Sequence, residues 1–116
     1  MKKSLTENRP WGKFHILHEE ENFKVKKIEV DSNMRLSYQF HDYRSEYWII
    51  IKGKALITID DESKEYEKGE VIYIPKMARH RVKNIGRERL VFVEVQTGSY
   101  FGEDDITRIE DDFNRD

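Results

Sequence analysis

Three observations predict an all-β fold, a single small barrel or sandwich of antiparallel strands. Short runs rich in β-branched and aromatic residues alternate between apolar and polar positions. Turn signals such as Lys52-Gly53, Lys68-Gly69 and Ile85-Gly86 separate these runs. No stretch has a helical period of useful length, apart from one turn near Gly102–Ile106.

Seven strands are expected in chain order. The first alternating stretch runs from Phe23 to Val30 and the second covers Met34–Phe40. In the second, Leu36, Tyr38 and Phe40 share an apolar face, while Arg35, Ser37 and Gln39 share the opposite, polar face. The remaining strands are expected at Glu46–Ile51, Lys54–Ile59, Val71–Ile74, Arg79–Val82 and Leu90–Val95.

Length and composition restrict the class of protein. The 116 residues suffice for one domain over 1–116, with a core at about 9–109 and an acidic tail at 110–116. Lys and Arg number 21 against 23 Asp and Glu, so no basic excess favours nucleic acid. The longest apolar run, Trp48–Ile51, is too short for a membrane span, and no signal peptide is indicated, so we expect a cytoplasmic protein. The absence of Cys excludes a thiolate metal site.

A candidate site is formed by polar residues on the expected strands. Gln39 and His41 lie two residues apart and therefore leave the same face, which is the polar one. Glu46 follows a short turn, and His80 comes from a separate strand after Pro75. Two imidazole nitrogens and two oxygens form a donor set that suits Zn²⁺, Mn²⁺ or Fe²⁺.

The spacing of these residues resembles the two motifs of the cupin superfamily, whose ligands bind a metal inside a β-barrel. The matching patterns are Gln39-x-His41-x4-Glu46-x6-Gly53 and Gly69-x5-Pro75-x-Met77-x2-His80-x3-Asn84. Asn33, Gln39 and Met77 stand where the motifs have Gly, His and Gly. Asn tolerates a positive φ, whereas Met77 deprives a tight turn of its glycine. The resemblance implies a single cupin (double-stranded β-helix, jelly-roll) barrel.

A narrower resemblance is to the type II phosphomannose isomerase domain, the cupin usually fused behind a mannose-1-phosphate guanylyltransferase. It is carried by Arg9–Gly12, Arg35–Gln39, Arg44–Trp48 and Glu94–Ile106. It implies interconversion of mannose 6-phosphate and fructose 6-phosphate, in nucleotide-sugar and polysaccharide biosynthesis. Since 116 residues cannot hold the transferase, a separate guanylyltransferase is an expected partner.

This resemblance also implies roles for individual residues. Gln39, His41, Glu46 and His80 would bind a divalent metal, zinc first, with manganese, iron, cobalt or nickel as alternatives. Glu94 and Arg108 are the candidate catalytic residues, and the residues expected to contact the sugar phosphate are Arg35, Arg44, Tyr43 and Gln96. Asp42, Tyr43 and Tyr47 replace histidines that are common in the group, and we interpret these positions as lying either around the metal ligands or on the substrate side.

Several alternatives stay open from the sequence. His41 and His80 could be ordinary barrel residues bonded to the backbone, and Glu46 could pair with Arg44 on a surface turn. The acidic run Gly102–Ile106 could be a helix N-terminal turn. The chain could also be a non-catalytic sugar-binding or regulatory cupin, or a cupin enzyme acting on a nucleotide-linked sugar. A homodimer formed through sheet edges is expected from the habit of cupins.

Overall fold

A computed structural model describes residues 5–115, and this part of the chain forms eleven β-strands and no helix. Residues 1–4 and Asp116 of the expected domain lie outside the described residues. The strands are β1 (Thr6–Arg9), β2 (Gly12–Glu19), β3 (Phe23–Val30), β4 (Tyr38–Phe40), β5 (Arg44–Lys52), β6 (Lys54–Ile59), β7 (Glu62–Glu67), β8 (Val71–Ile74), β9 (His80–Asn84), β10 (Leu90–Gly98) and β11 (Thr107–Glu110).

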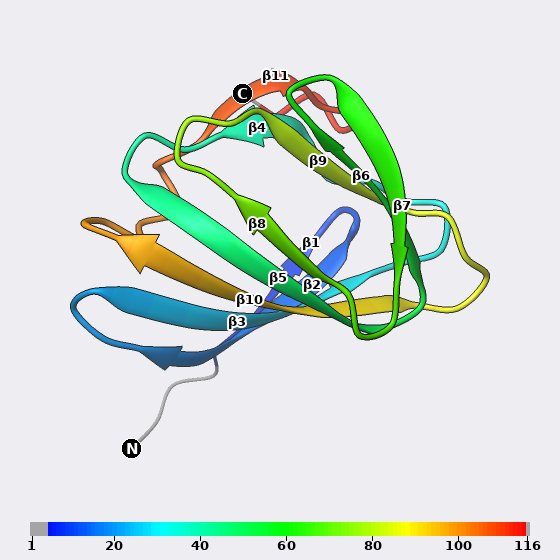
Figure 1. The fold of residues 1–116 in the computed structure, drawn as a ribbon, viewed down its shortest axis with the longest axis horizontal. Coiled ribbons are helices and arrows are strands. Elements are labelled where there is room, and N and C mark those ends of the chain that lie inside the picture. The colour runs from blue at the N-terminus through cyan, green and yellow to red at the C-terminus, as the bar shows by residue number, and fades with distance from the viewer. Residues whose placement is uncertain (1–4, 116) are drawn as a thin grey trace.

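The strands form two antiparallel sheets that face each other around the core (Figure 1). One sheet has six strands in the order β1-β2-β3-β10-β5-β8, and the other has five in the order β11-β4-β9-β6-β7. The predicted all-β fold is confirmed. No helix among residues 5–115 is long and apolar enough to cross a membrane.

All seven expected strands are present, but four further strands were missed and one expectation was wrong. The missed strands are β1, β2, β7 and β11, of which β1, β7 and β11 lie at sheet edges, where a polar sequence such as that of Glu62–Glu67 is tolerated. The expected strand Met34–Phe40 starts only at Tyr38, since Arg35 makes an isolated bridge to Lys83.

Two turns confirm the interpretation of the altered glycine positions. Asn33 has a φ of 67° and Met77 a φ of 73°, so both occupy the left-handed region that favours glycine. At Gly102–Ile106 there is no helix; instead the amide of Asp105 donates to the carbonyl of Gly102 at 3.1 Å, closing a turn.

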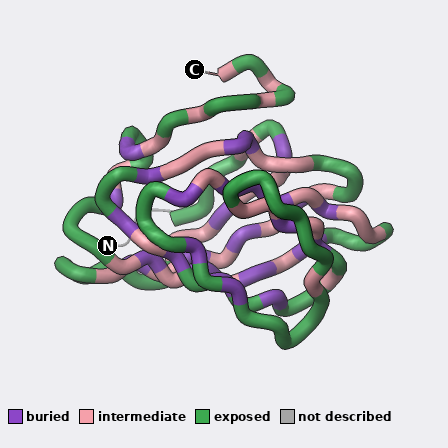
Figure 2. The backbone as a smooth tube through the Cα atoms, turned by 45° about the horizontal axis from the view of Figure 1, so that its top comes forward, coloured by how far each residue is buried: buried purple, intermediate pink, exposed green. Residues whose placement is uncertain are grey.

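The interior of the barrel is apolar at one end and polar at the other. The apolar end contains Phe92, Ile50, Val30 and other buried residues of one continuous core. Toward the other end of β3, β10 and β5, the buried positions become Lys24 and Lys26, Glu94 and Gln96, and Arg44 and Glu46. Figure 2 shows buried segments along the central strands and exposed ones mainly in the loops and in β7. The polar end of the barrel is where a site can form.

The C-terminal segment belongs to the folded domain. After β11, Phe113 packs against the apolar core, and Arg115 holds the buried carboxylate of Asp111 through Nε at 2.8 Å. The order of the chain thus continues past residue 109, where the sequence placed the end of the core.

Candidate metal centre

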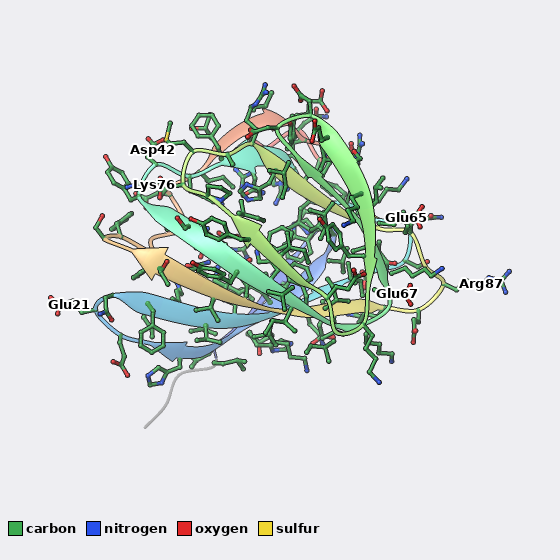
Figure 3. All side chains as sticks on the ribbon, viewed as in Figure 1. Glu21, Asp42, Glu65, Glu67, Lys76 and Arg87 are labelled. Atoms are coloured by element: carbon green, nitrogen blue, oxygen red, sulfur yellow. The ribbon has the colours of Figure 1, made fainter. Side chains whose placement is uncertain are left out.

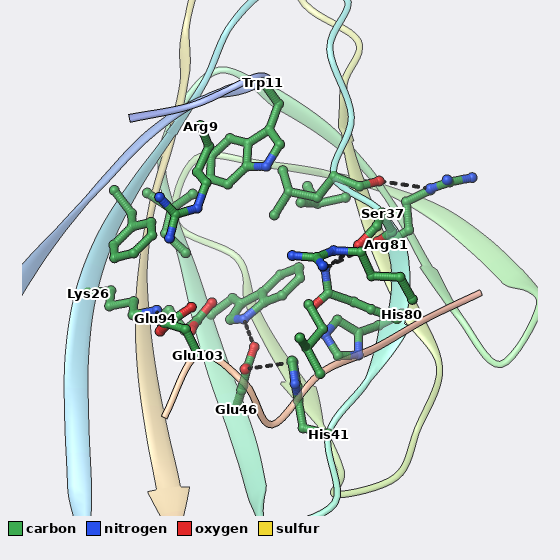
Figure 4. Close-up of a pocket in the computed structure, with 18 of the residues that line it drawn as sticks. Arg9, Trp11, Lys26, Ser37, His41, Glu46, His80, Arg81, Glu94 and Glu103 are labelled. Atoms are coloured by element: carbon green, nitrogen blue, oxygen red, sulfur yellow. Dashed lines mark hydrogen bonds and ion pairs between the residues drawn. The ribbon is translucent and has the colours of Figure 1, made fainter. Parts of the chain in front are cut away.

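Three buried side chains from different strands converge at the polar end of the barrel (Figure 4). His41 follows the last residue of β4, Glu46 lies on β5, and His80 opens β9. One donor atom of each lies within 4.8 Å of the other two. The polar face expected on the sequence therefore exists, and it brings both imidazoles to the carboxylate.

Both histidines bond to backbone carbonyls through Nδ1, while Nε2 of His41 lies 3.4 Å from Nη2 of Arg44. Nδ1 of His41 lies 2.7 Å from the carbonyl oxygen of Asp105, and Nδ1 of His80 lies 3.0 Å from that of Ala78. Because a carbonyl only accepts, each Nδ1 carries the proton and each Nε2 keeps its lone pair. This arrangement is typical of metal-bound histidine. The hydrogen bonds to the backbone that one alternative from the sequence proposed are therefore present. They do not exclude a ligand, because they involve only Nδ1 of each ring.

Gln39 is placed beside these residues by strand register. It pairs with His80 on β9 and with Arg108 on β11, so the three side chains form one row across the sheet. Nε2 of Gln39 donates to the Ser37 hydroxyl at 2.9 Å. Its carbonyl oxygen is therefore the atom that it can offer to a metal. The donor set of two imidazoles, one carboxylate and one amide oxygen fits a divalent cation such as zinc.

The protonation states also fit a metal. Burial lowers the pKa of His41 to about 4 and also lowers the pKa of His80. Burial opposes ionisation of Glu46, but His41, Arg44 and His80 together outweigh it and keep the Glu46 pKa below its ordinary value. At neutral pH the imidazoles are neutral and the carboxylate is charged, which is the state that metal binding requires.

Arg44 compensates the buried charge of Glu46. Its Nε donates to Oε2 of Glu46 at 3.0 Å, while Trp48 Nε1 donates to Oε1 at 2.9 Å. Both members of the Arg44–Glu46 pair are buried, so the alternative of a surface ion pair is wrong. Because Arg44 neutralises it, the buried carboxylate of Glu46 does not carry the full free-energy cost of an unpaired buried charge.

The acidic run after β10 holds the loop that carries His41. The carboxylate of Asp105 accepts from the amides of Asp42 at 2.9 Å and Tyr43 at 3.1 Å, while its carbonyl binds the His41 ring. Ser99 donates through its amide to the carbonyl of Tyr43 at 3.1 Å. The role of the Gly102–Ile106 run is therefore to position the turn between β4 and β5.

The side chains of the candidate metal centre lie in the wall of a cavity that is partly open to solvent and that, counted with this open space, has a volume of about 620 Å³. Its wall among residues 5–115 carries six cations and three glutamates, which are Arg9, Lys26, Arg44, Arg81, Arg108, Arg115, Glu46, Glu94 and Glu103. The excess of positive charge favours an anionic ligand.

Glu94 is a buried carboxyl in the cavity wall. On the sheet it lies between Lys26 of β3 and Trp48 of β5. Burial, together with the negative charge of Glu46, raises the pKa of Glu94 to about 8. Lys26 is drawn toward Glu103, to which its ammonium group donates. Glu94 therefore holds a proton near neutral pH, and a wall group of this kind can exchange protons with a ligand.

Three of the residues expected to contact substrate lie elsewhere. Arg35 precedes the short strand β4 and pairs with Asp112 on the outside, at 2.7 Å, because the period-two alternation breaks before Tyr38. Tyr43 is exposed and packs edge-on against Tyr100. Gln96 is buried but lies behind the wall, where Nε2 donates to Glu94. Arg44 lines the cavity as expected, and so do Glu94 and Arg108.

The substitutions of common histidines also lie outside the cavity. Asp42 projects from the surface (Figure 3), and Tyr47 faces outward from β5, where its ring meets that of Tyr73. Their interpretation as substrate-side positions was wrong. The reason is that Tyr47 has the opposite parity to Glu46 on the strand, while Asp42 and Tyr43 lie in the turn.

Several wall residues escaped the sequence analysis. Arg9, Lys26 and Arg81 all line the cavity, and Lys26 lies over the ring of Phe14 at 4.1 Å. Lys24 and Lys26 lie at alternate positions of β3 and therefore share one face of the strand. This spacing was the signal in the sequence that pointed to an inward-facing cation. They were overlooked because lysine is rarely buried.

The fold has many solved counterparts. It resembles the capsular polysaccharide assembling protein CapF from Staphylococcus aureus, with a TM-score of 0.79 and 21% identity over 95% of this chain and 32% of CapF. It also resembles the Cnp3 cupin domain of Schizosaccharomyces pombe, with a TM-score of 0.72 and 22% identity over 74% of this chain and 64% of that one. The antiparallel barrel and these neighbours define the class by its fold: the chain has the cupin fold.

The family follows from sequence comparison. Residues 1–111 match the family model described as mannose-6-phosphate isomerase C-terminal, and the chain belongs to this family. It is 43% identical over 107 residues to the xanthan biosynthesis protein XanB of Xanthomonas campestris pv. campestris, covering 92% of this chain and 23% of XanB. It is 42% identical over 107 residues to the mannose-1-phosphate guanylyltransferase ManC of Salmonella typhimurium, covering 92% and 22%. The chain thus spans less than a quarter of the length of these relatives.

Proposed function

We propose that this chain is a metal-dependent isomerase that interconverts mannose 6-phosphate and fructose 6-phosphate in the cytoplasm, for nucleotide-sugar and polysaccharide biosynthesis. The observation that carries the proposal is the buried group of His41, Glu46 and His80 in the wall of a cation-rich cavity. Membership of the family supports the substrate class. Zinc is the proposed metal because its usual ligands are imidazole and carboxylate groups.

The isomerisation requires one proton to leave C2 of the aldose and return to C1 of the ketose, while the proton of O2 moves to O1. A bound divalent metal would polarise the sugar oxygens. Glu94 is the proposed carrier of the carbon-bound proton, since its pKa of about 8 lies near the working pH and populates both of its forms. Gln96 donates to Glu94 from behind and fixes the orientation of the carboxyl group.

The cations of the wall would bind the negative charge of the substrate. Arg108 lies in the same row as Gln39 and His80. Its proposed role is therefore to stabilise the negative charge that develops on the sugar oxygens during the reaction. Among residues 5–115, Arg9 pairs only with exposed groups, Glu7 at 2.9 Å and the carbonyl of Asn8, apart from its contact with the ring of Phe14. Its guanidinium is thus free to exchange Glu7 for a phosphate, which Arg binds in bidentate fashion.

Metal content and turnover test this proposal together. The purified protein is expected to contain about one zinc per chain and to convert mannose 6-phosphate in a coupled assay, with loss of turnover after chelation and recovery on adding zinc. His80→Ala is expected to lose the metal, whereas His18→Ala is the matched control, because His18 is exposed and bonds only to Glu20. Metal without turnover would refute the isomerase and leave a sugar-binding cupin. Unchanged metal affinity in His80→Ala would refute the ligand set.

A further inference from the structure

One side of the cavity is formed by the segment that follows the acidic run after β10. We define residues 106–115 as the C-terminal strap, which contains β11 and the turn after it. Ile106, Arg108 and Arg115 of the strap line the cavity. On β11, Arg108 is half-buried whereas the other three residues of the strand are exposed, so the strand turns one cation inward. Two of the six cations of the cavity wall therefore depend on the placement of the strap.

The backbone attaches the strap to the barrel over a short distance. β11 is an edge strand of the five-stranded sheet and pairs with β4, which has three residues (Figure 1). The register shifts between Arg108 and Glu110, so a bulge interrupts even this short ladder. Segments with few protected backbone hydrogen bonds open at a lower free energy than central strands do. Side chains, Phe113 in the core among them, must therefore help to hold the strap in place.

Two arginines of the barrel hold the strap through ion pairs. Nε and Nη2 of Arg35 each donate to one oxygen of Asp112, both at 2.7 Å. This two-bond geometry is the stronger form of an Arg–carboxylate pair, and it keeps the pKa of Asp112 below its ordinary value. Arg81 donates to the carboxylate of Glu110 at 3.1 Å and to its carbonyl at 3.3 Å, while its Nε donates to the carbonyl of Leu36. Both arginines thus connect the strap to residues outside it.

Arg35 is itself fixed to an interior strand. Its backbone forms a bridge to Lys83 of β9, and the amide of the following residue, Leu36, donates to the carbonyl of Val82 at 3.0 Å. β9 lies between β4 and β6 in its sheet. Arg35 is not among the described residues that line the cavity, so it can act on a ligand there only through the strap.

We infer that the C-terminal strap closes over an anionic ligand in the cavity, and that Arg35 is a positioning residue that holds the strap closed. A ligand in the cavity meets Arg108 only when the strap lies against the barrel, and the Arg35–Asp112 pair stabilises the same state. The ligand and the ion pair should therefore each slow the opening of the strap. The inference rests on the proposed function in so far as the anion is a sugar phosphate.

Hydrogen–deuterium exchange of the full chain, measured by mass spectrometry, tests the role of Arg35. Arg35→Ala is expected to speed exchange in the strap by about 3–10-fold, because it removes a two-bond ion pair that is partly exposed. Exchange in β7 of the same sheet is expected to stay unchanged. Arg89→Ala is the matched control, since Arg89 is similarly exposed and binds Asp31 at 2.9 Å outside the cavity. Its strap is expected to exchange as that of the wild type does.

The same measurement with ligand tests the closure of the strap. Mannose 6-phosphate is the first probe and inorganic phosphate the second, and calorimetry gives the dissociation constant of each. At ten times that constant, a ligand that requires the closed strap slows exchange in it by about 10-fold. A strap that only stabilises the fold, without contact to the ligand, would exchange at the same rate with and without it.

Rescue variants complete the test. Exchanging the two charges, Arg35→Asp together with Asp112→Arg, is expected to restore slow exchange. Arg35→Lys keeps the charge but loses the two-bond geometry, so it is expected to exchange at an intermediate rate, and it replaces Arg35→Ala if that variant does not fold. Unchanged strap exchange in the Arg35 variants, or a strap that neither phosphate slows, would overturn the inference. Slowing by mannose 6-phosphate without turnover would support the inference and refute the isomerase alone.

Discussion

Replacing Asp105 with Ala tests whether the acidic run after β10 positions the metal-ligating loop. The substitution removes the carboxylate that accepts from the amides of Asp42 and Tyr43, at 2.9 and 3.1 Å. A hydrogen bond to a charged group contributes about 1.5–3 kcal/mol. Because the turn is partly exposed, water replaces some of the loss, and we expect a total of about 2–3 kcal/mol. For a domain of this size that corresponds to a fall in Tm on the order of 10 °C.

The same substitution is expected to weaken zinc binding. The ring of His41 is held by the carbonyl of Asp105, and this carbonyl keeps its place through the two carboxylate bonds of the same residue. Loss of an outer partner of a metal ligand typically costs about 10–100-fold in metal affinity. Competition with a chromogenic chelator measures that affinity, and thermal unfolding of the metal-free protein measures the stability.

Asp104→Ala is the control for Asp105→Ala. It removes the same charge from the neighbouring position, but Asp104 is exposed and, within the described part of the chain, accepts only from the Tyr100 hydroxyl. Asp105→Asn keeps one acceptor oxygen and is expected to lie between the wild type and Asp105→Ala in both measurements. If Asp105→Ala binds zinc and unfolds as Asp104→Ala does, the run has no positioning role and the reasoning fails.

Two further predictions concern backbone strain and pH. Met77→Gly is expected to raise the stability by about 0.5–1 kcal/mol, because Met77 has a φ of 73°, which costs an L-residue about 1–2 kcal/mol, partly offset by the greater freedom of unfolded glycine. Met77→Ala, which keeps the strain, is its control in thermal unfolding. Folded Glu94 keeps its proton up to about pH 8, whereas an ordinary Glu loses it near 4.5, so the stability of the metal-free protein should fall as pH rises through this range. Glu94→Gln is expected to make the free energy of unfolding less dependent on pH. Above pH 8 it is expected to raise that free energy by as much as about 4 kcal/mol.

Each of these two predictions has a clear contrary result. A Met77→Gly protein no more stable than Met77→Ala would show that the turn does not strain the methionine. For Glu94, the informative quantity is the slope of stability against pH between about 4.5 and 8. Equal slopes for the wild type and Glu94→Gln would show that Glu94 ionises at its ordinary pKa.

The residues of the candidate metal centre could be predicted because local rules govern their placement. Gln39 and His41 lie two residues apart at the end of β4, so the period of a strand is enough to place them on one face. The motif spacing then connected them to Glu46 and His80, and the structure brings the donor atoms of His41, Glu46 and His80 together. No assumption about tertiary structure beyond the barrel was needed for this step.

The errors arise where the local period ends. Arg35 was assigned to the inner face by extending the alternation backward from Gln39, but the strand begins at Tyr38, and Leu36 and Ser37 both line the cavity. Tyr43 lies in a turn, where no period applies. The role of Asp105 depends on its contact with Asp42, which lies 63 residues earlier in the chain. No pattern in the sequence encodes a contact between segments so far apart.

The polar residues inside the barrel and the apolar residues on the outside of β10 are two consequences of one constraint. Side chains of a strand alternate strictly, so the inward positions of β10 that hold Glu94 in the cavity wall and Gln96 behind it leave Val93 and Val95 on the outside. These strands therefore bury less apolar surface in their own barrel than an ordinary half-exposed antiparallel strand does, because polar side chains take their inward positions.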